Sequence, residues 1–100
     1  MNPAFVSAAE MLRAPTAAGL PPQRIKGTLC VWCGQEPSMD LGPRLSVIKG
    51  TLQRWHPRSC RPCARSEAAR VHGIHRQTCP RCSHGEPCPD GRALYDLAVL

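Results

Sequence analysis

The sequence predicts a small α+β domain that is held together by bound metal rather than by a large hydrophobic core. The chain has 100 residues, and aromatic residues make up only 4% of them. A chain of this length buries a modest fraction of its surface on folding, so it benefits from cross-links. Six of the seven cysteines form three CxxC pairs, and three pairs with one cysteine left over are more typical of metal sites than of a disulfide framework.

The N-terminal region 1–22 is expected to form a short helix and a linker ahead of a two-zinc domain over residues 23–100. Phe5 and Leu12 lie at helical spacing, and Pro15 should end the helix. A helix of this length does not persist alone in water. It therefore docks on the zinc domain or on a partner, or it remains a frayed tail.

Residues 28–34 (TLCVWCG) are expected to form a short strand that runs into a zinc knuckle, a tight turn in which two cysteines hold one ion. Gly34 stands where the knuckle backbone tends to adopt a positive φ, which glycine tolerates. Two apolar runs, 45–48 and 51–55, flank a Lys-Gly pair at 49–50. Their spacing predicts a β-hairpin.

Two helices are expected in the C-terminal half. The first runs from Ala64 to about Gln77, because small and apolar residues recur there on one stripe, which also carries His75. Pro80 should end this helix, since proline disfavours a helical conformation of the preceding residue. A terminal helix over 91–100, with Asp90 as its cap, completes the predicted α+β arrangement.

The first metal site is assigned to Cys30, Cys33, Cys60 and Cys63. A gap of 26 residues, which holds the predicted hairpin, separates the two pairs. Two knuckles joined by a hairpin can bring four sulfurs around one Zn²⁺ at about 2.3 Å. The second pair also opens the predicted helix, whose dipole favours thiolates. Disulfides and an iron–sulfur cluster are the alternatives to zinc.

The second metal site is assigned to His75, Cys79, Cys82 and Cys88. His75 and Cys79 are four residues apart, so they share a helix face. Cys82 returns to the ion through the third CxxC pair, and Cys88 completes the set. His84, inside the loop between Cys82 and Cys88, is the main alternative for the histidine ligand.

Each assigned site has four protein ligands, so neither zinc ion would keep an open position for water. Closed sites of this kind are structural rather than catalytic. The sequence also contains no Ser-His-Asp arrangement and no glycine loop that would cradle phosphate. We therefore expect two structural Zn²⁺ ions as cofactors, no enzymatic activity and no small-molecule substrate.

The distribution of charge favours a polyanionic partner. The formal net charge is +6, and no acidic residue occurs between Leu41 and Ser66. A surface with one sign of charge attracts phosphate backbones, although it can equally be a solvated face that keeps a small protein soluble. The best candidates for contact with nucleic acid are Arg54, Arg58, Arg61 and Arg65.

The sequence favours a cytoplasmic location without membrane contact. No cationic leader precedes an apolar run at the N-terminus. No apolar stretch approaches the roughly 20 residues that span a bilayer. Thiols stay reduced in the cytoplasm and so remain available to zinc.

The order of knuckle, hairpin and helix, from Leu29 to about Gln77, resembles the treble-clef and zinc-ribbon superfamily. That superfamily includes nucleic-acid-binding proteins, ribosomal proteins and HNH nucleases. The chain lacks the Asp-His pair and the later Asn and His that such a nuclease needs, so nuclease activity does not follow from the resemblance.

Two local motifs resemble other families. The segment His75-x3-Cys79-x2-Cys82 is similar to the HxxxCxxC motif of zinc-binding anti-sigma factors, which take a further upstream ligand and have no counterpart of Cys88. The spacing from Cys79 to Cys88 also resembles the last three cluster ligands of WhiB-like iron–sulfur regulators, whose glycine-rich turn and basic tail are absent here. The short, arginine-rich and cysteine-rich form resembles small zinc-finger proteins of actinobacteria and their phages.

These observations favour a nucleic-acid-binding or transcription-associated zinc protein. One alternative is an adaptor that binds a protein partner through its N-terminal segment and C-terminal helix. Another is a thiol redox switch, in which oxidation of the cysteines expels zinc, or a WhiB-like iron–sulfur regulator.

Overall fold

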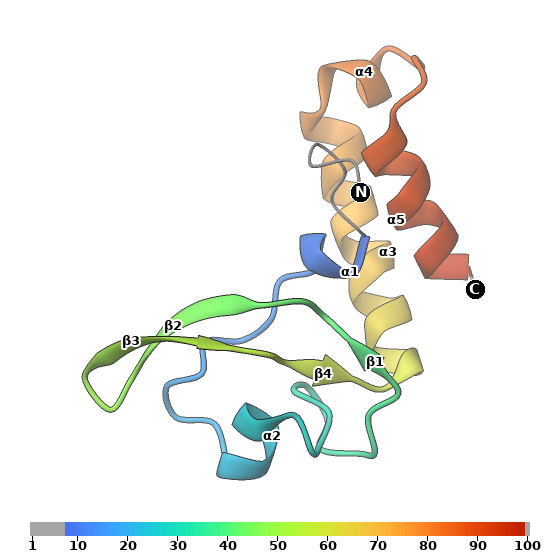
Figure 1. Ribbon diagram of the computed structural model, residues 1–100. Coiled ribbons are helices and arrows are strands. Elements are labelled where there is room, and N and C mark those ends of the chain that lie inside the picture. Colours follow the sequence, from blue (N-terminus) through green and yellow to red (C-terminus); the bar gives the residue numbers. More distant parts are fainter. Residues whose placement is uncertain (1–7, 100) are drawn as a thin grey trace, which may run out of the picture. The chain divides into compact units, whose positions relative to one another are not determined.

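The computed structural model describes residues 8–99, which form helices and short strands in two units (Figure 1). The hairpin unit comprises residues 14–63, and the helical unit comprises residues 8–13 and 64–99. The small α+β class that the sequence predicts is confirmed. In chain order the elements are α1 (Ala8–Met11), α2 (Pro22–Lys26), β1 (Met39–Asp40), β2 (Arg44–Ile48), β3 (Thr51–Trp55), β4 (Arg58–Ser59), α3 (Arg61–Thr78), α4 (Pro80–Ser83) and α5 (Pro89–Val99).

The four strands form an interrupted hairpin. Strand β2 pairs with β3 and strand β1 pairs with β4, both antiparallel. The chain therefore runs out along β1 and β2 and returns along β3 and β4 (Figure 1). The chain reverses at Lys49 and Gly50, whose φ angles are 51° and 79°. Two positive φ angles in succession define the tight turn that matches the twist of a hairpin. The predicted hairpin is therefore confirmed.

The turn predicts a stabilising substitution. Lys49 adopts a left-handed conformation that disfavours most side chains, whereas asparagine tolerates it and precedes glycine in the commonest turns of this type. We expect Lys49→Asn to raise the free energy of unfolding of the metal-loaded protein by about 1 kcal/mol. Denaturant titration measures the change. Lys49→Ala is the control, because it removes the same charge without the turn preference, and equal stabilisation by both variants would attribute the effect to charge.

The core of the hairpin unit is small and lies against the face of β2 and β3 that carries Ser46 and Trp55. Ser46 Oγ accepts a hydrogen bond of 3.3 Å from the backbone N–H of Ala17, which ties residues before α2 to this face. Trp55 is only 5% exposed. The other buried residues of this unit include Ala17, Cys30, Val31, Leu41 and Pro57.

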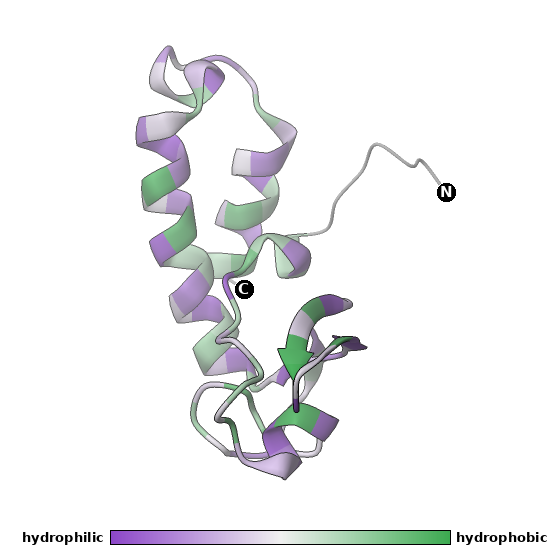
Figure 2. Cartoon of the chain, turned by 90° about the vertical axis from the view of Figure 1, so that its left-hand side faces the viewer, coloured by the Kyte–Doolittle hydropathy of each residue, from purple (hydrophilic) through white to green (hydrophobic). Residues whose placement is uncertain are grey.

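The helical unit has an equally small core. Helix α1 lies against α5, and His72 of α3 meets Tyr95 of α5 with ring centroids 5.8 Å apart. Figure 2 shows hydrophilic and hydrophobic residues alternating along both α3 and α5, as expected of amphipathic helices. The fully or nearly fully buried side chains are Leu12, Ala64, Ala68 and Leu94.

The prediction of a strand over residues 28–34 is wrong. This segment forms turns, because most of its backbone donors bond within residues 23–35, although the N–H of Val31 donates to the carbonyl of Arg58 in β4 at 2.9 Å. The N–H of Cys30 donates to the carbonyl of Gln35 at 2.7 Å, and that of Gly34 donates to the carbonyl of Cys30 at 3.0 Å. Gly34 has a φ of 76°, as the knuckle prediction requires.

Helix α2 begins at Pro22, the last residue of the predicted linker, where the sequence analysis expects no helix. Pro22 occupies the start of the helix, and Gly27 ends it with a φ of 83°. Proline at the start and glycine just past the end are the usual start and stop signals of a helix. Helix α3 begins at Arg61, three residues before the predicted Ala64, and α5 begins at Pro89.

Three further expectations concern the ends and the membrane. The predicted start of the N-terminal helix lies outside the described residues. The described part of this helix is α1. The division into 1–22 and 23–100 stays a prediction. Among residues 8–99, no helix is both long and apolar enough to cross a lipid bilayer.

Candidate metal centres

The structure brings together the four cysteines that the sequence assigns to the first site. The sulfurs of Cys30, Cys33, Cys60 and Cys63 all lie within 4.8 Å of one another. The first two belong to the knuckle after α2, Cys60 directly precedes α3, and Cys63 lies in the first turn of that helix. All four belong to the hairpin unit.

The spacing of these sulfurs fits a tetrahedral ion. Cys33 Sγ and Cys60 Sγ are 3.6 Å apart. Four sulfurs at about 2.3 Å from a central zinc ion would be separated by about 3.8 Å. A disulfide bond, by contrast, requires about 2.05 Å, and the cysteines of the chain are free thiols in this structure. The first set is therefore arranged around a common centre and not in bonded pairs.

Burial and backbone hydrogen-bond donors shift the pKa of Cys30 in opposite directions. The side chain is fully buried, and burial alone raises its pKa. Hydrogen bonds from the backbone at Cys60, Cys33 and Trp32 outweigh burial and lower the pKa of Cys30 to about 6. Ser59 Oγ also lies 3.9 Å from Cys30 Sγ. Backbone donors of the knuckle and of the segment before α3 thus favour the thiolate form of Cys30.

Cys60 and Cys63 ionise less readily than Cys30. Burial raises the pKa of Cys60. Burial also raises the pKa of Cys63, and the neighbouring thiols add to that shift through their hydrogen bonds. Four thiolates so close together repel one another unless a cation lies between them. A divalent ion would supply that charge and drive the deprotonation of the whole set.

The second predicted set is also brought together. The ligand atoms of His75, Cys79, Cys82 and Cys88 lie within 4.8 Å of one another. His75 Nε2 is 3.3 Å from Cys88 Sγ, and Cys79 Sγ is 3.9 Å from the same sulfur. His84, the alternative histidine, is exposed, follows the end of α4 and is not part of this group.

Proline and helix geometry position the second set. Helix α3 ends at Thr78, and Pro80 begins α4, so the chain turns at Cys79 and brings Cys82 back toward the histidine. The N–H of Cys79 still donates to the carbonyl of His75 at 2.8 Å, which keeps these two ligands one helical turn apart. The sequence spacing therefore positions three of the four ligands through local structure alone.

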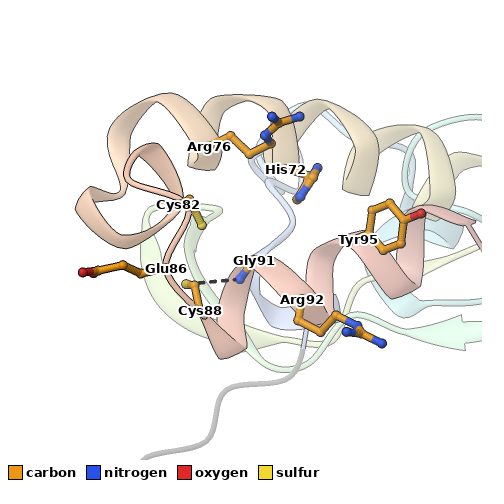
Figure 3. Close-up of a pocket in the computed structure, with 9 residues that line it drawn as sticks. His72, Arg76, Cys82, Glu86, Cys88, Gly91, Arg92 and Tyr95 are labelled. Carbon is orange, nitrogen blue, oxygen red and sulfur yellow. Dashed lines mark hydrogen bonds between the residues drawn. The ribbon is translucent and has the colours of Figure 1, made fainter.

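Cys88 has a second role at the start of α5. Its sulfur accepts a hydrogen bond of 3.5 Å from the N–H of Gly91 (Figure 3), and its carbonyl accepts one of 3.0 Å from the N–H of Arg92. Asp90, the predicted cap, lies instead within the first turn of the helix.

The pKa values of the two thiols in the third CxxC pair are shifted in opposite directions. Backbone hydrogen bonds, chiefly at Cys82, lower the pKa of Cys79. Burial, with hydrogen bonds from Cys88 and Cys79, raises the pKa of Cys82 to about 11. As in the first set, the backbone stabilises one thiolate, and full deprotonation requires a cation.

A cleft opens beside the second set. It has a volume of about 390 Å³ and is lined by residues of α3, α4, α5 and the loop between α4 and α5. Figure 3 shows His72 and Tyr95 on the two facing helices and Cys82 and Cys88 near the other end. Both cysteines line the cleft, so a chelator in solution can reach this set.

Gly91 is a site residue that the sequence analysis missed. A Cβ atom at this position would lie 2.9 Å from Cys82 Sγ and 3.4 Å from His75 Cδ2. Only glycine lets the start of α5 approach the ligands so closely. The signal in the sequence was a glycine three residues after Cys88, at the start of a predicted helix.

We expect Gly91→Ala to weaken metal binding at the second set by about tenfold or more, because 2.9 Å is too short for a carbon–sulfur contact. Competition with a chromogenic chelator measures the affinity. Gly73→Ala is the matched control. Its Cβ would meet nothing within 4 Å in α3, so it should stabilise the protein by about 1 kcal/mol and leave both affinities unchanged. Equal affinities in the two variants would contradict the role of Gly91.

The structure places the predicted phosphate-binding arginines at exposed positions. Arg54 lies on β3, Arg58 on β4 and Arg61 at the start of α3, all in the hairpin unit. Arg65, one turn further along α3, belongs to the helical unit. Exposure is required both for phosphate contact and for a solvated face, so these positions are compatible with either use.

Comparisons with family models, with curated proteins and with solved structures found no match to this chain. The two ligand sets are therefore the features of the chain that point to a function. Four sulfurs form one set, and three sulfurs with one imidazole nitrogen form the other. Both sets could hold a metal ion, and their donors are those that zinc and iron–sulfur centres use.

Proposed function

We propose that this chain is a non-catalytic protein with two structural zinc ions that binds nucleic acid through its basic surface. The observation that carries the proposal is the convergence of two complete ligand sets, each within 4.8 Å. Sets of four cysteines, or of three cysteines and one histidine, are the usual ligands of structural zinc. Four protein ligands complete a tetrahedron and leave no position for a reacting water.

A treble-clef-like finger is the interpretation we propose for the first set. The knuckle, the hairpin and the N-terminal turn of α3 follow one another in that order and supply its ligands. The turn at Cys79 and Cys82 would be a second zinc knuckle. Small buried cores in both units support the need for such cross-links. A cytoplasmic location suits this role, because thiols stay reduced there.

Contact with nucleic acid is supported by charge. The stretch from Leu41 to Ser66 contains no acidic residue, and its exposed arginines include Arg54, Arg58 and Arg61. Guanidinium groups pair with phosphate oxygens in a forked geometry, and such contacts position a protein on a nucleic acid without reading its sequence.

Elemental analysis and a visible absorption spectrum test the metal part of the proposal. Protein purified without oxygen should contain two zinc ions per chain and be colourless. A brown protein that contains iron would contradict zinc and favour the iron–sulfur alternative.

A mobility-shift titration with DNA and RNA over a range of salt concentrations tests the nucleic-acid part. The double variant Arg54→Gln/Arg58→Gln should lower the slope of log affinity against log salt by roughly 2. The matched control is Arg70→Gln/Arg92→Gln, which removes two arginines that pair with Glu67 and Asp96 within their own helices. Absence of binding at low salt, or an equal loss in both double variants, would refute the proposal.

A further inference from the structure

We propose that the outward face of the β2–β3 hairpin binds an acidic segment of a partner protein that carries apolar side chains between its carboxylates. The face is defined by Leu45, Val47, Leu52 and Arg54. The three aliphatic side chains are 68%, 55% and 65% exposed. Contiguous exposed apolar groups of this kind mark interaction sites in soluble proteins.

The strand register shows that these side chains are neighbours. Val47 pairs directly with Leu52, and Leu45 pairs with Arg54. Directly paired residues in an antiparallel sheet point to the same side, with Cβ atoms about 5 Å apart. Residues two apart on one strand also share a face, so the four side chains form one continuous surface.

The opposite face of the hairpin is already occupied within the hairpin unit. It carries Ser46, which bonds to Ala17, and the buried Trp55. The register thus turns Ser46 and Ile48 inward and Leu45 and Val47 outward, so the exposed face carries more aliphatic side chains than the covered one. Departures of this kind from the expected pattern occur where function requires them.

Charge decides between the possible occupants. Arg54 belongs to the face, and Lys49 stands at the turn next to it. No acidic residue occurs between Leu41 and Ser66 to neutralise them. A second copy of the chain would bring the same cations against each other across a two-fold interface. A segment with glutamate or aspartate between apolar residues satisfies both the aliphatic surface and its basic rim.

Fluorescence anisotropy with a short synthetic peptide of alternating leucine and glutamate tests the proposal on the metal-loaded, full-length chain. The wild-type chain should bind this peptide. It should bind at least about tenfold more weakly a peptide with lysine in place of glutamate, or serine in place of leucine. The variant Leu45→Ser/Leu52→Ser should lose at least about tenfold in affinity for the first peptide.

The control variant Ile74→Ser/Val99→Ser removes two exposed aliphatic side chains from the helical unit and should leave peptide binding unchanged. Neither variant should change the zinc content, and Leu45→Ser/Leu52→Ser should not lower the melting temperature. Three results would overturn the proposal: equal binding of the acidic and basic peptides, a fall in melting temperature in Leu45→Ser/Leu52→Ser that reveals coverage by the chain itself, or a loss of oligonucleotide binding in that variant without any peptide binding.

Discussion

Removal of both metal ions is expected to unfold the chain. A structural zinc ion contributes about 10–16 kcal/mol of apparent binding free energy at neutral pH. The net stability of a whole domain is only about 5–15 kcal/mol. Because few side chains are buried in either unit, we expect that the hydrophobic contribution cannot replace even one ion. Circular dichroism during titration with a strong chelator should show loss of the helical signal and of the thermal transition.

The control for this experiment is the return of the metal. Zinc added to the stripped, thiol-reduced sample should restore the spectrum, whereas magnesium, which prefers oxygen ligands, should not. Elemental analysis of the stripped sample confirms that both ions have left. A metal-free sample that keeps the full spectrum and melting temperature would refute the structural role of the ions.

Replacement of one ligand is expected to empty one set and leave the other filled. Cys30→Ser substitutes a hydroxyl, a poor zinc ligand, for a fully buried thiolate. The zinc content should fall from two ions per chain to one, and proteolysis should become rapid within residues 14–63. Each ligand set lies within a single unit, so the helical unit should keep its ion.

Two companion variants make this result specific. Cys82→Ser should also leave one ion, but with rapid proteolysis in residues 64–99. His84→Ala should keep both ions, because His75 and not His84 lies with the other ligands of the second set. Loss of both ions from either cysteine variant would contradict the independence of the two sets.

The hairpin could be predicted from the sequence because its signal is local. A Lys-Gly pair between two apolar runs specifies a tight turn, and the structure has it. The second ligand set could likewise be anticipated, because a histidine and a cysteine four residues apart share a helix face. A proline then forces the return of the chain toward Cys82.

Other features depend on information that local patterns do not contain. Residues 28–34 are apolar enough for a strand, but most of their backbone donors bond within residues 23–35 and not to a neighbouring strand. The face of β2 that points outward could not be predicted, because Leu45 and Val47 alternate with Ser46 and Ile48, and both faces therefore contain an apolar residue. The need for glycine at position 91 arises from sulfur and imidazole atoms that are distant in sequence.

Because the N–H of Gly91 donates to the sulfur of Cys88, an ion bound to that sulfur would also nucleate α5. This helix has 11 residues, too few to be stable alone in water. Its first turn is the unfavourable step of helix formation, and that turn contacts a sulfur whose position a bound metal would fix. Winding of α5 would then follow occupancy of the second set, and any surface that the helix presents would exist only while zinc is in supply.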